Sequence, residues 1–249
     1  MTQDERLIEL EGVVNNQGKV TLEYICQTYG ISYDSARRDL VKLTQLSGII
    51  RIRGGAIRGE KKTEFPFVQR SLRTPEKERL AAFAASTVVD NDIMFIDAGT
   101  TSLSLARHIK NPSRAITNSP EVMNELINNP LVAVSVLGGT FSEFSHAILG
   151  SMTVEQIRRY QADKAFIGVS ALSESGITTD SEDDALLKKA MADHARKVVC
   201  IATSEKFNTQ LMYQSCTWAD IDYVITSTAP PLNILRIIQE HEVELIVIE

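Results

Sequence analysis

The sequence predicts an α/β protein with a small N-terminal winged helix-turn-helix domain and a larger C-terminal domain built on a mostly parallel sheet. Closely spaced amphipathic helices followed by a short hairpin predict the first domain. Apolar strands that alternate with helices predict the second, because parallel strands need helical crossovers. The 249 residues are enough for both, and 43% hydrophobic with 23% charged residues is typical of a soluble globular protein.

The ends of the first two N-terminal helices can be read from single residues. Apolar residues recur through 4–17, and Gly18 follows as a stop signal. Thr21 is a good N-cap for a second helix over 22–29, because its hydroxyl can accept a hydrogen bond from a first-turn amide. Gly30 can end that helix in the left-handed conformation that glycine tolerates.

A third helix is expected directly after Ser32, which is a second good N-cap. Apolar residues recur at i, i+4 and i+7 to form one buried stripe, namely Ala36, Leu40 and Leu43. The other faces carry polar and cationic side chains, namely Asp34, Arg37, Arg38 and Lys42. We expect this helix to run to about Leu46 and to end at Gly48. The pair of helices predicts a helix-turn-helix whose second helix is presented to a DNA major groove.

The segment after this helix has the pattern of a β-hairpin. Apolar Ile50 and Ile52 alternate with Arg51 and Arg53, which is the periodicity of a strand. Gly54-Gly55 is a turn signal. A hairpin directly after a helix-turn-helix is a wing, and its arginines can reach phosphates or a minor groove.

The net charge of −6 conceals an uneven distribution along the chain. Residues 1–62 carry ten Lys and Arg against eight Asp and Glu, whereas residues 63–249 carry sixteen against twenty-four. Within 37–62 there are eight cations and two carboxylates. The basic charge is therefore concentrated where a local DNA footprint requires it.

The stretches Ser32–Leu43, with Ala36-Arg37-Arg38-Asp39-Leu40 at its centre, and Ile50–Ala56 resemble the N-terminal signature of the DeoR family of bacterial sugar-responsive transcription regulators. The resemblance continues over nearly the whole chain. Eight residues are expected to contact DNA bases or phosphates, namely Tyr33, Ser35, Arg37, Arg38, Lys42, Arg51, Arg53 and Arg58. Asp39 is expected instead to pair with an arginine and orient it, because a carboxylate beside phosphates is unfavourable.

Polar, irregular sequence over 59–75 predicts a linker between a DNA-binding domain of residues 1–58 and a domain of residues 76–249. Pro75 is placed at the first position of a helix that runs to about Val89. Short apolar strands are then expected at 93–96, 115–117, 132–137, 165–168, 198–202, 223–226 and 245–248. The helices between them are expected at 102–109, 120–128, 152–160, 183–195 and 232–241. This alternation predicts a mostly parallel sheet covered on both faces.

Small polar residues follow most of these strands. The first strand is followed by Asp97-Ala98-Gly99-Thr100-Thr101, the second by Asn118 and the third by Gly138-Gly139. Ligands of open α/β sheets bind outside the carboxyl ends of the strands, and helix N-termini there can hold an anion. The pattern indicates a site for an anion or a polyol.

The resemblance implies that the C-terminal domain resembles sugar-phosphate isomerases and CoA transferases, binds a phosphorylated sugar or related metabolite, and forms oligomers. By resemblance the pocket or its rim comprises Asp97, Gly99, Thr100, Thr101, Asn118, Gly138, Gly139, Lys164, Asp184 and Lys206. The chain departs from the family at Ser142 and Phe144, where arginines are common, and at Thr203, where aspartate is usual. An arginine fork is the best side-chain clamp for phosphate. The effector is thus a phosphate held mainly by backbone amides, an unphosphorylated polyol or a sugar acid.

The function expected from these features is a DNA-binding transcription regulator, a repressor of a carbohydrate-catabolism operon that a sugar phosphate or related metabolite relieves. The rival is an enzyme, a sugar-phosphate isomerase or transferase with an N-terminal DNA-binding appendage, in which Asp97, Asp184 and Lys206 supply acid–base groups. A third alternative is an oligomerising adaptor whose pocket stays empty.

The expected partners are operator DNA and a small carbohydrate effector, with the chain acting as a homodimer or homotetramer because DNA half-sites repeat with the helical turn. No cofactor, metal or membrane partner is expected. The three cysteines have no zinc spacing, and no apolar run approaches the roughly 18 residues of a membrane span. We expect a cytoplasmic protein that associates with the nucleoid when it is bound to DNA.

Overall fold

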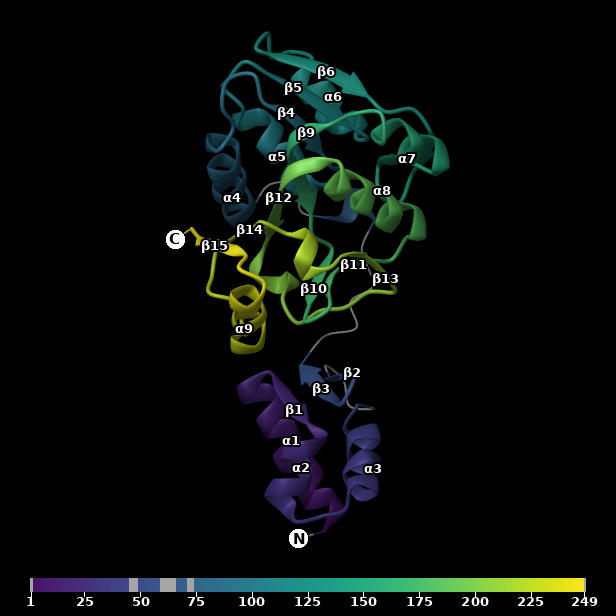
Figure 1. Cartoon of the computed structure of the whole chain (residues 1–249), viewed down its shortest axis with the longest axis vertical. Coiled ribbons are helices and arrows are strands. Elements are labelled where there is room, and N and C mark those ends of the chain that lie inside the picture. The colour runs from purple at the N-terminus through teal and green to yellow at the C-terminus, as the bar shows by residue number, and fades with distance from the viewer. Residues whose placement is uncertain (1, 45–48, 59–65, 71–73, 249) are drawn as a thin grey trace.

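The computed structural model describes residues 2–44, 49–58, 66–70 and 74–248, and shows a small N-terminal domain at one end of a larger α/β domain (Figure 1). No helix among these residues is both long and apolar enough to cross a membrane.

The N-terminal domain is a winged helix-turn-helix, as predicted. Its elements are α1 (Gln3–Gln17), β1 (Lys19–Thr21), α2 (Leu22–Tyr29), α3 (Tyr33–Leu43), β2 (Ile49–Ile52) and β3 (Gly55–Arg58). Thr21 and Ser32 cap their helices through their side chains, and Gly18 and Gly30 end theirs with φ of 77° and 61°. These residues predicted the helix ends correctly because each capping or stop signal acts within one helical turn.

The α3 helix is shorter than expected. It ends at Leu43, and the expected extension to Leu46 with a stop at Gly48 falls in 45–48, outside the described residues. Its predicted stripe is correct, since Ala36, Leu40 and Leu43 are buried.

The two glycines of the wing have different roles. Gly54 lies in the turn with a φ of 79°, which favours glycine. Gly55 begins β3 and needs its missing side chain for another reason, because a Cβ there would lie 2.2 Å from the carbonyl oxygen of Val20. The approach of β1 to β3 in the three-stranded order β1-β3-β2 therefore depends on Gly55.

The C-terminal domain contains a seven-stranded, fully parallel sheet in the order β15-β14-β12-β9-β4-β5-β6. Its strands are β4 (Ile93–Ile96), β5 (Ser113–Thr117), β6 (Val132–Val136), β9 (Ala162–Gly168), β12 (Ala195–Ala202), β14 (Tyr223–Thr226) and β15 (Glu244–Val247). The helices are α4 (Pro75–Ser86), α5 (Thr100–His108), α6 (Pro120–Leu126), α7 (Ser151–Ile157), α8 (Glu182–Asp193) and α9 (Leu232–Glu240).

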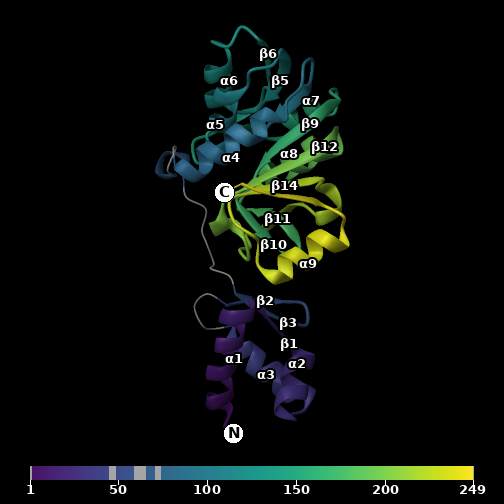
Figure 2. The same ribbon diagram turned by 90° about the vertical axis from the view of Figure 1, so that its left-hand side faces the viewer.

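Helices cover both faces of this sheet, as the sequence predicted (Figure 2). On one face, Leu80 of α4, Leu105 of α5 and Val122 of α6 pack in one buried cluster with residues of the strands. On the other, residues of α7, α8 and α9 form a second cluster. The α4 helix ends at Ser86 rather than at about Val89.

Two small antiparallel sheets were not predicted. One is the hairpin of β7 (Thr140–Ser142) and β8 (Ala147–Leu149), and the other joins β10 (Ala171–Ser173), β11 (Gly176–Thr179) and β13 (Tyr213–Cys216). Their strands are too short for a clear alternation of polar and apolar side chains, and most are not the continuous apolar runs that identified equally short strands of the parallel sheet. Three short 3-10 helices lie at Phe67–Gln69, Ser204–Lys206 and Trp218–Asp220.

Candidate DNA-binding surface and effector pocket

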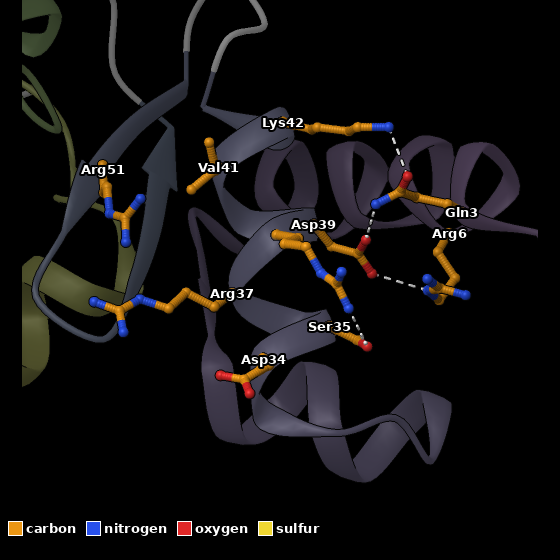
Figure 3. Close-up of a pocket in the computed structure, with 10 residues that line it drawn as sticks. Gln3, Arg6, Asp34, Ser35, Arg37, Asp39, Val41, Lys42 and Arg51 are labelled. Atoms are coloured by element: carbon orange, nitrogen blue, oxygen red, sulfur yellow. Dashed lines mark hydrogen bonds and ion pairs between the residues drawn. The ribbon is translucent and has the colours of Figure 1, made fainter.

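A groove of about 1040 Å³ runs beside the exposed face of α3 (Figure 3). Arg37, Arg38 and Lys42 of α3 line it together with Arg51 of the wing, and all four are exposed. In Figure 3, Arg37 and Arg51 lie on one side of α3 and the α1 residues Gln3 and Arg6 on the other. Cations thus flank the exposed face of α3 on both sides, which is the arrangement that a duplex with two phosphate backbones requires.

Asp39 lines the groove at its buried side and joins α3 to α1. Its carboxylate is fully buried and accepts from Arg6 Nε at 2.9 Å and from Gln3 Nε2 at 2.6 Å. Gln3 Oε1 in turn accepts from Lys42 Nζ at 2.6 Å. The predicted pairing of Asp39 with an arginine is confirmed, and its partner comes from a different helix 33 residues away.

Asp39→Asn is expected to lower stability by about 3 kcal/mol, because it removes one partner of a largely buried ion pair and leaves Arg6 without its carboxylate. Thermal melting of the full chain measures this. Asp34→Asn is the control, since Asp34 is an exposed first-turn carboxylate of the same helix and is worth only about 0.3–1 kcal/mol there. Equal shifts for the two variants would contradict the proposed role of Asp39.

The other residues expected to contact DNA are distributed around this groove. Tyr33 is 56% exposed at the start of α3, and Ser35 lines the groove and accepts from Arg38 Nη2 at 3.3 Å. Arg53 is exposed in the turn of the wing and does not line the groove. The backbone of Arg58 ends β3, and its side chain lies outside what the structure describes.

A second cavity, of about 790 Å³, opens at the carboxyl ends of the parallel strands. From β4 the chain adds β5 and then β6 towards one edge of the sheet. It then returns to β9 on the other side of β4 and adds β12, β14 and β15 towards the opposite edge, so the strand order reverses between β4 and β9. Residues directly after β4, β9 and β12 line the cavity, including Gly99, Ser170 and Thr203. Open α/β sheets bind ligands at this switch point.

One wall of the cavity is a buried charged cluster. Lys188 of α8 pairs with Asp97 and, at 3.3 Å, with Asp184, which also accepts from Thr179 Oγ1 at 2.8 Å. Burial raises the pKa of Asp97 to about 6, although the ammonium of Lys188 opposes the shift. Asp184 and Lys188 line the cavity, whereas Asp97 lies behind them and also accepts from the amide of Gly168 at 3.0 Å. Such a cluster can exchange hydrogen bonds with ligand hydroxyls.

Three cations from three segments also line the cavity, namely Arg70, Lys77 and Lys206. Lys77 Nζ donates to Thr100 Oγ1 at 2.9 Å, at the N-terminus of α5. Burial lowers the pKa of Lys77, and repulsion from Lys206 and Arg70 lowers it further. An anion held between them would relieve this repulsion and would also face the positive end of the helix dipole.

Several residues expected in the pocket are elsewhere. Gly99, Thr100, Thr101, Asp184 and Lys206 line the cavity, but Asp97, Asn118, Gly138, Gly139 and Lys164 do not. Asn118 and the two glycines follow β5 and β6, on the far side of the switch point. Lys164 is near the amino end of β9 and pairs with Asp92 at 2.5 Å.

Gly139 allows a close approach between two segments of the chain. A Cβ there would lie 2.1 Å from Thr153 Oγ1, so the glycine lets the chain pass close to α7. The structure places Asn118, Gly138 and Gly139 in the neighbouring fold and Lys164 in an ion pair, and their assignment to the pocket or its rim stays a prediction.

Sequence reasoning missed Arg70, Lys77 and Lys188. Lys188 follows Asp184 by four residues on α8, so helical spacing alone places both on one face and could have identified it. Arg70 and Lys77 lie in or next to the expected linker and carried no local signal. Ser142 and Phe144, where arginines are common in the family, line the cavity. Arg70 supplies a guanidinium to the same cavity from a different segment.

Clusters of His, Cys, Asp and Glu suited to a metal ion are not found in the described parts of the chain.

Comparison with known proteins gives matches for both domains. A DeoR-like helix-turn-helix domain model matches residues 6–62, and a DeoR C-terminal sensor domain model matches residues 72–228. The HTH-type transcriptional repressor GlcR of Bacillus subtilis is 34% identical over 252 residues, which is 100% of this chain and 98% of that protein. The glycerol-3-phosphate regulon repressor of Escherichia coli is 27% identical over 249 residues, which is 98% of this chain and 99% of that protein.

Among solved structures, ribose 5-phosphate isomerase A of Methanocaldococcus jannaschii has a TM-score of 0.39 at 16% identity, covering 53% of each chain. The eIF2B beta subunit of Chaetomium thermophilum has a TM-score of 0.48 at 16% identity and covers 67% of this chain and 53% of its own. The two domain models together match most of the sequence in the same order as the two domains of the structure. The chain therefore belongs to the DeoR family of transcription regulators.

Proposed function

We propose that this protein is a repressor of a carbohydrate-catabolism operon, and that a phosphorylated sugar or polyol in the C-terminal cavity relieves repression. The cations that flank α3 support DNA binding, and the names of the relatives support repression. The observation that carries the effector class is the lining of the cavity, which combines the Lys188 and Asp184 ion pair with the cations Lys77 and Lys206.

This arrangement supports a ligand with hydroxyls at one end and an anion at the other. Thr203 can add a contact with a ligand hydroxyl, because it is buried and lines the cavity, and its own hydroxyl has no hydrogen-bond partner among the described residues. A hydroxyl left unsatisfied in a buried site costs about 1–3 kcal/mol, which a ligand can recover. Among the three effector classes left open by the sequence, we therefore favour phosphorylated polyols and sugars.

The same geometry argues against catalysis. Asp97 has a raised pKa, but its carboxylate lies behind the cavity wall and is engaged by Lys188 and the Gly168 amide. A general base must reach the proton that it removes. We therefore propose a binding site without turnover, and turnover of any pentose or hexose phosphate by the purified protein would contradict this.

We further propose that the chain acts as a homodimer or homotetramer in the cytoplasm, because paired half-sites on one face of the duplex need paired recognition helices.

The proposed function is tested by two measurements on the full chain. Mobility-shift titration with DNA from upstream of its own gene and of neighbouring sugar genes is expected to give salt-dependent, sequence-specific binding. A melting screen with glucose 6-phosphate, fructose 6-phosphate and glycerol 3-phosphate is expected to raise Tm by mass action, whereas the parent sugars and glycerol raise it less. Absence of DNA binding, or of any shift, would contradict it.

Lys77→Met is expected to weaken binding of the phosphorylated ligand by about tenfold and of the unphosphorylated parent by less than about twofold, because a hydrogen bond to a charged group is worth about 1.5–3 kcal/mol. Ligand titration by calorimetry measures both. Lys110→Met, at an exposed lysine outside the cavity, is the control and is expected to change neither. Equal weakening of both ligands by Lys77→Met would place the phosphate elsewhere.

A further inference from the structure

The two domains contact each other through a polar interface at the turn after α1. Lys19 begins β1, and its Nζ donates to Glu174 Oε2 at 2.8 Å. Glu174 lies in the turn between β10 and β11. In both overall views this hairpin and α9 form the end of the larger domain that faces the winged helix-turn-helix (Figures 1 and 2).

Behind this ion pair is a short hydrogen-bonded chain inside the larger domain. Glu174 Oε1 accepts from Asn233 Nδ2 at 3.2 Å. Asn233 and Asn208 then donate to each other, with distances of 2.8 Å and 3.4 Å, and both are more than nine-tenths buried. Gly18 packs over the two amides, since a Cβ there would lie 3.3 Å from Asn233 Oδ1. We call these five residues, Gly18, Lys19, Glu174, Asn208 and Asn233, the interdomain contact.

The interdomain contact is continuous with the wall of the cavity. Asn208 lies two residues after Lys206 and three before Leu211, and both of those line the cavity. The amide of Leu211 donates to Thr178 Oγ1 at 2.8 Å, and Thr179 after it in β11 also lines the cavity. Glu174 is in the hairpin that β11 completes. Two of the three segments that meet the DNA-binding domain, the β10–β11 hairpin and the Asn208 loop, therefore continue into residues that line the cavity.

Asn208 has a backbone conformation that makes this loop sensitive to its surroundings. Its φ is 54°, a left-handed value that is uncommon outside glycine but that asparagine tolerates. Thr209 Oγ1 donates back to the carbonyl of Lys206 at 2.6 Å, which ties the Asn208 turn to the cavity residue. A ligand that displaces the backbone of Lys206 would therefore displace the Asn208 turn as well.

We propose that the interdomain contact is the surface through which an occupied cavity changes the position of the DNA-binding domain. On the larger domain this surface consists of Glu174, Asn208 and Asn233. It binds the α1–β1 corner of the DNA-binding domain of the same chain. The ligand acts by binding the cavity more tightly in one arrangement of the contact than in another, and the change in DNA affinity cannot exceed that difference. This inference rests on the proposed function, since it needs both an operator and an effector.

The test uses full-length wild type, Glu174→Lys, Lys19→Glu and the double variant with the charges exchanged. Glu174 belongs to the larger domain, so Glu174→Lys disturbs the contact without altering a DNA-facing side chain. Glu240→Lys, at an exposed position in α9, gives the same change in net charge and is the control. Asn208→Gly removes the buried amide and keeps a residue that adopts the left-handed φ.

The quantity measured is the ratio of operator affinities without and with the metabolite that gives the largest Tm shift among glucose 6-phosphate, fructose 6-phosphate and glycerol 3-phosphate. We expect each single variant and Asn208→Gly to reduce this ratio by about two- to fivefold, the range that a partly exposed ion pair can supply. The double variant is expected to restore it, and the Tm shift by the metabolite is expected to persist throughout.

Small-angle X-ray scattering of the same proteins without metabolite tests the contact independently of any effector. Glu174→Lys is expected to increase the radius of gyration relative to wild type and Glu240→Lys, and the double variant to reverse the increase. A ratio and a radius equal to those of wild type in the single variants, or a double variant no better than they are, would overturn the inference. Wild type that binds no DNA or no metabolite would instead contradict the proposed function, and the scattering would still decide the contact.

Discussion

Arg38→Glu is expected to reduce operator affinity by about a hundredfold or more. Arg38 is exposed on the face of α3 that borders the groove, and Ser35 accepts from its guanidinium at 3.3 Å. The substitution removes an arginine contact worth about 1–3 kcal/mol with a base or phosphate and adds a carboxylate that repels the phosphates. Fluorescence anisotropy with operator DNA measures the loss at fixed salt.

Arg159→Glu is the matched control, because Arg159 is an exposed arginine on the larger domain and the change in net charge is the same. It is expected to alter affinity by less than about twofold at moderate salt, since the Debye length there is only about 8–10 Å. The slope of log affinity against log salt is expected to be steep for wild type and shallower by about one to two for Arg38→Glu. Salt-independent binding, or equal losses in both variants, would show that α3 is not the DNA-binding element.

Among the C-terminal substitutions proposed, Lys188→Met is expected to lower the free energy of unfolding the most. The Lys188 and Asp97 side chains are 3% and 0% exposed, and the cation is the partner of a fully buried carboxylate. Removing one partner of such a pair costs about 3–5 kcal/mol, because the other charge stays buried without compensation. We expect the Tm of this domain to fall by about 10 °C or more.

Lys189→Met is the control for this experiment. Lys189 is the next residue on α8, its side chain is 40% exposed, and its ion pairs with Asp193 and Asp220 are partly solvated, so the expected loss is less than about 1 kcal/mol. Lys188→Met combined with Asp97→Asn is expected to be more stable than Lys188→Met alone, since a neutral amide needs no cation. A double variant as unstable as the single one would contradict the ion-pair explanation.

The pH dependence of Lys188→Met has a definite sign. Burial already raises the pKa of Asp97 to about 6, above its ordinary value of 3.8, and loss of the ammonium raises it further. A carboxyl group with a raised native pKa binds its proton more tightly in the folded state, so the folded state is favoured as pH falls. The stability deficit of the variant relative to wild type is expected to shrink between about pH 8 and about pH 5.

Much of the fold could be predicted because its signals are local. Caps at Thr21 and Ser32, stops at Gly18 and Gly30, and the stripe of α3 each depend on residues within about two helical turns. The seven strands of the parallel sheet were also predicted, since buried parallel strands are continuous apolar runs. The two small antiparallel sheets were missed because most of their short strands mix polar and apolar residues and so lack a continuous apolar run.

The sequence by itself determined the helix-turn-helix, the wing, the parallel sheet and the family, because periodicity, capping and motif spacing are properties of neighbouring residues. Only the tertiary structure decided which charges meet. Arg6 reaches Asp39 across 33 residues, and Lys188 reaches Asp97 across 91.

Tertiary structure also decided which residues line the effector pocket. A residue that directly follows a strand of the parallel sheet lines this cavity only if that strand ends near the point where the strand order reverses, and that order is set by packing between distant segments. Gly99 and Thr203 meet this condition and Gly138 does not, although all three follow strands. Lys164 has suitable chemistry but belongs to the opposite end of β9, where it neutralises Asp92.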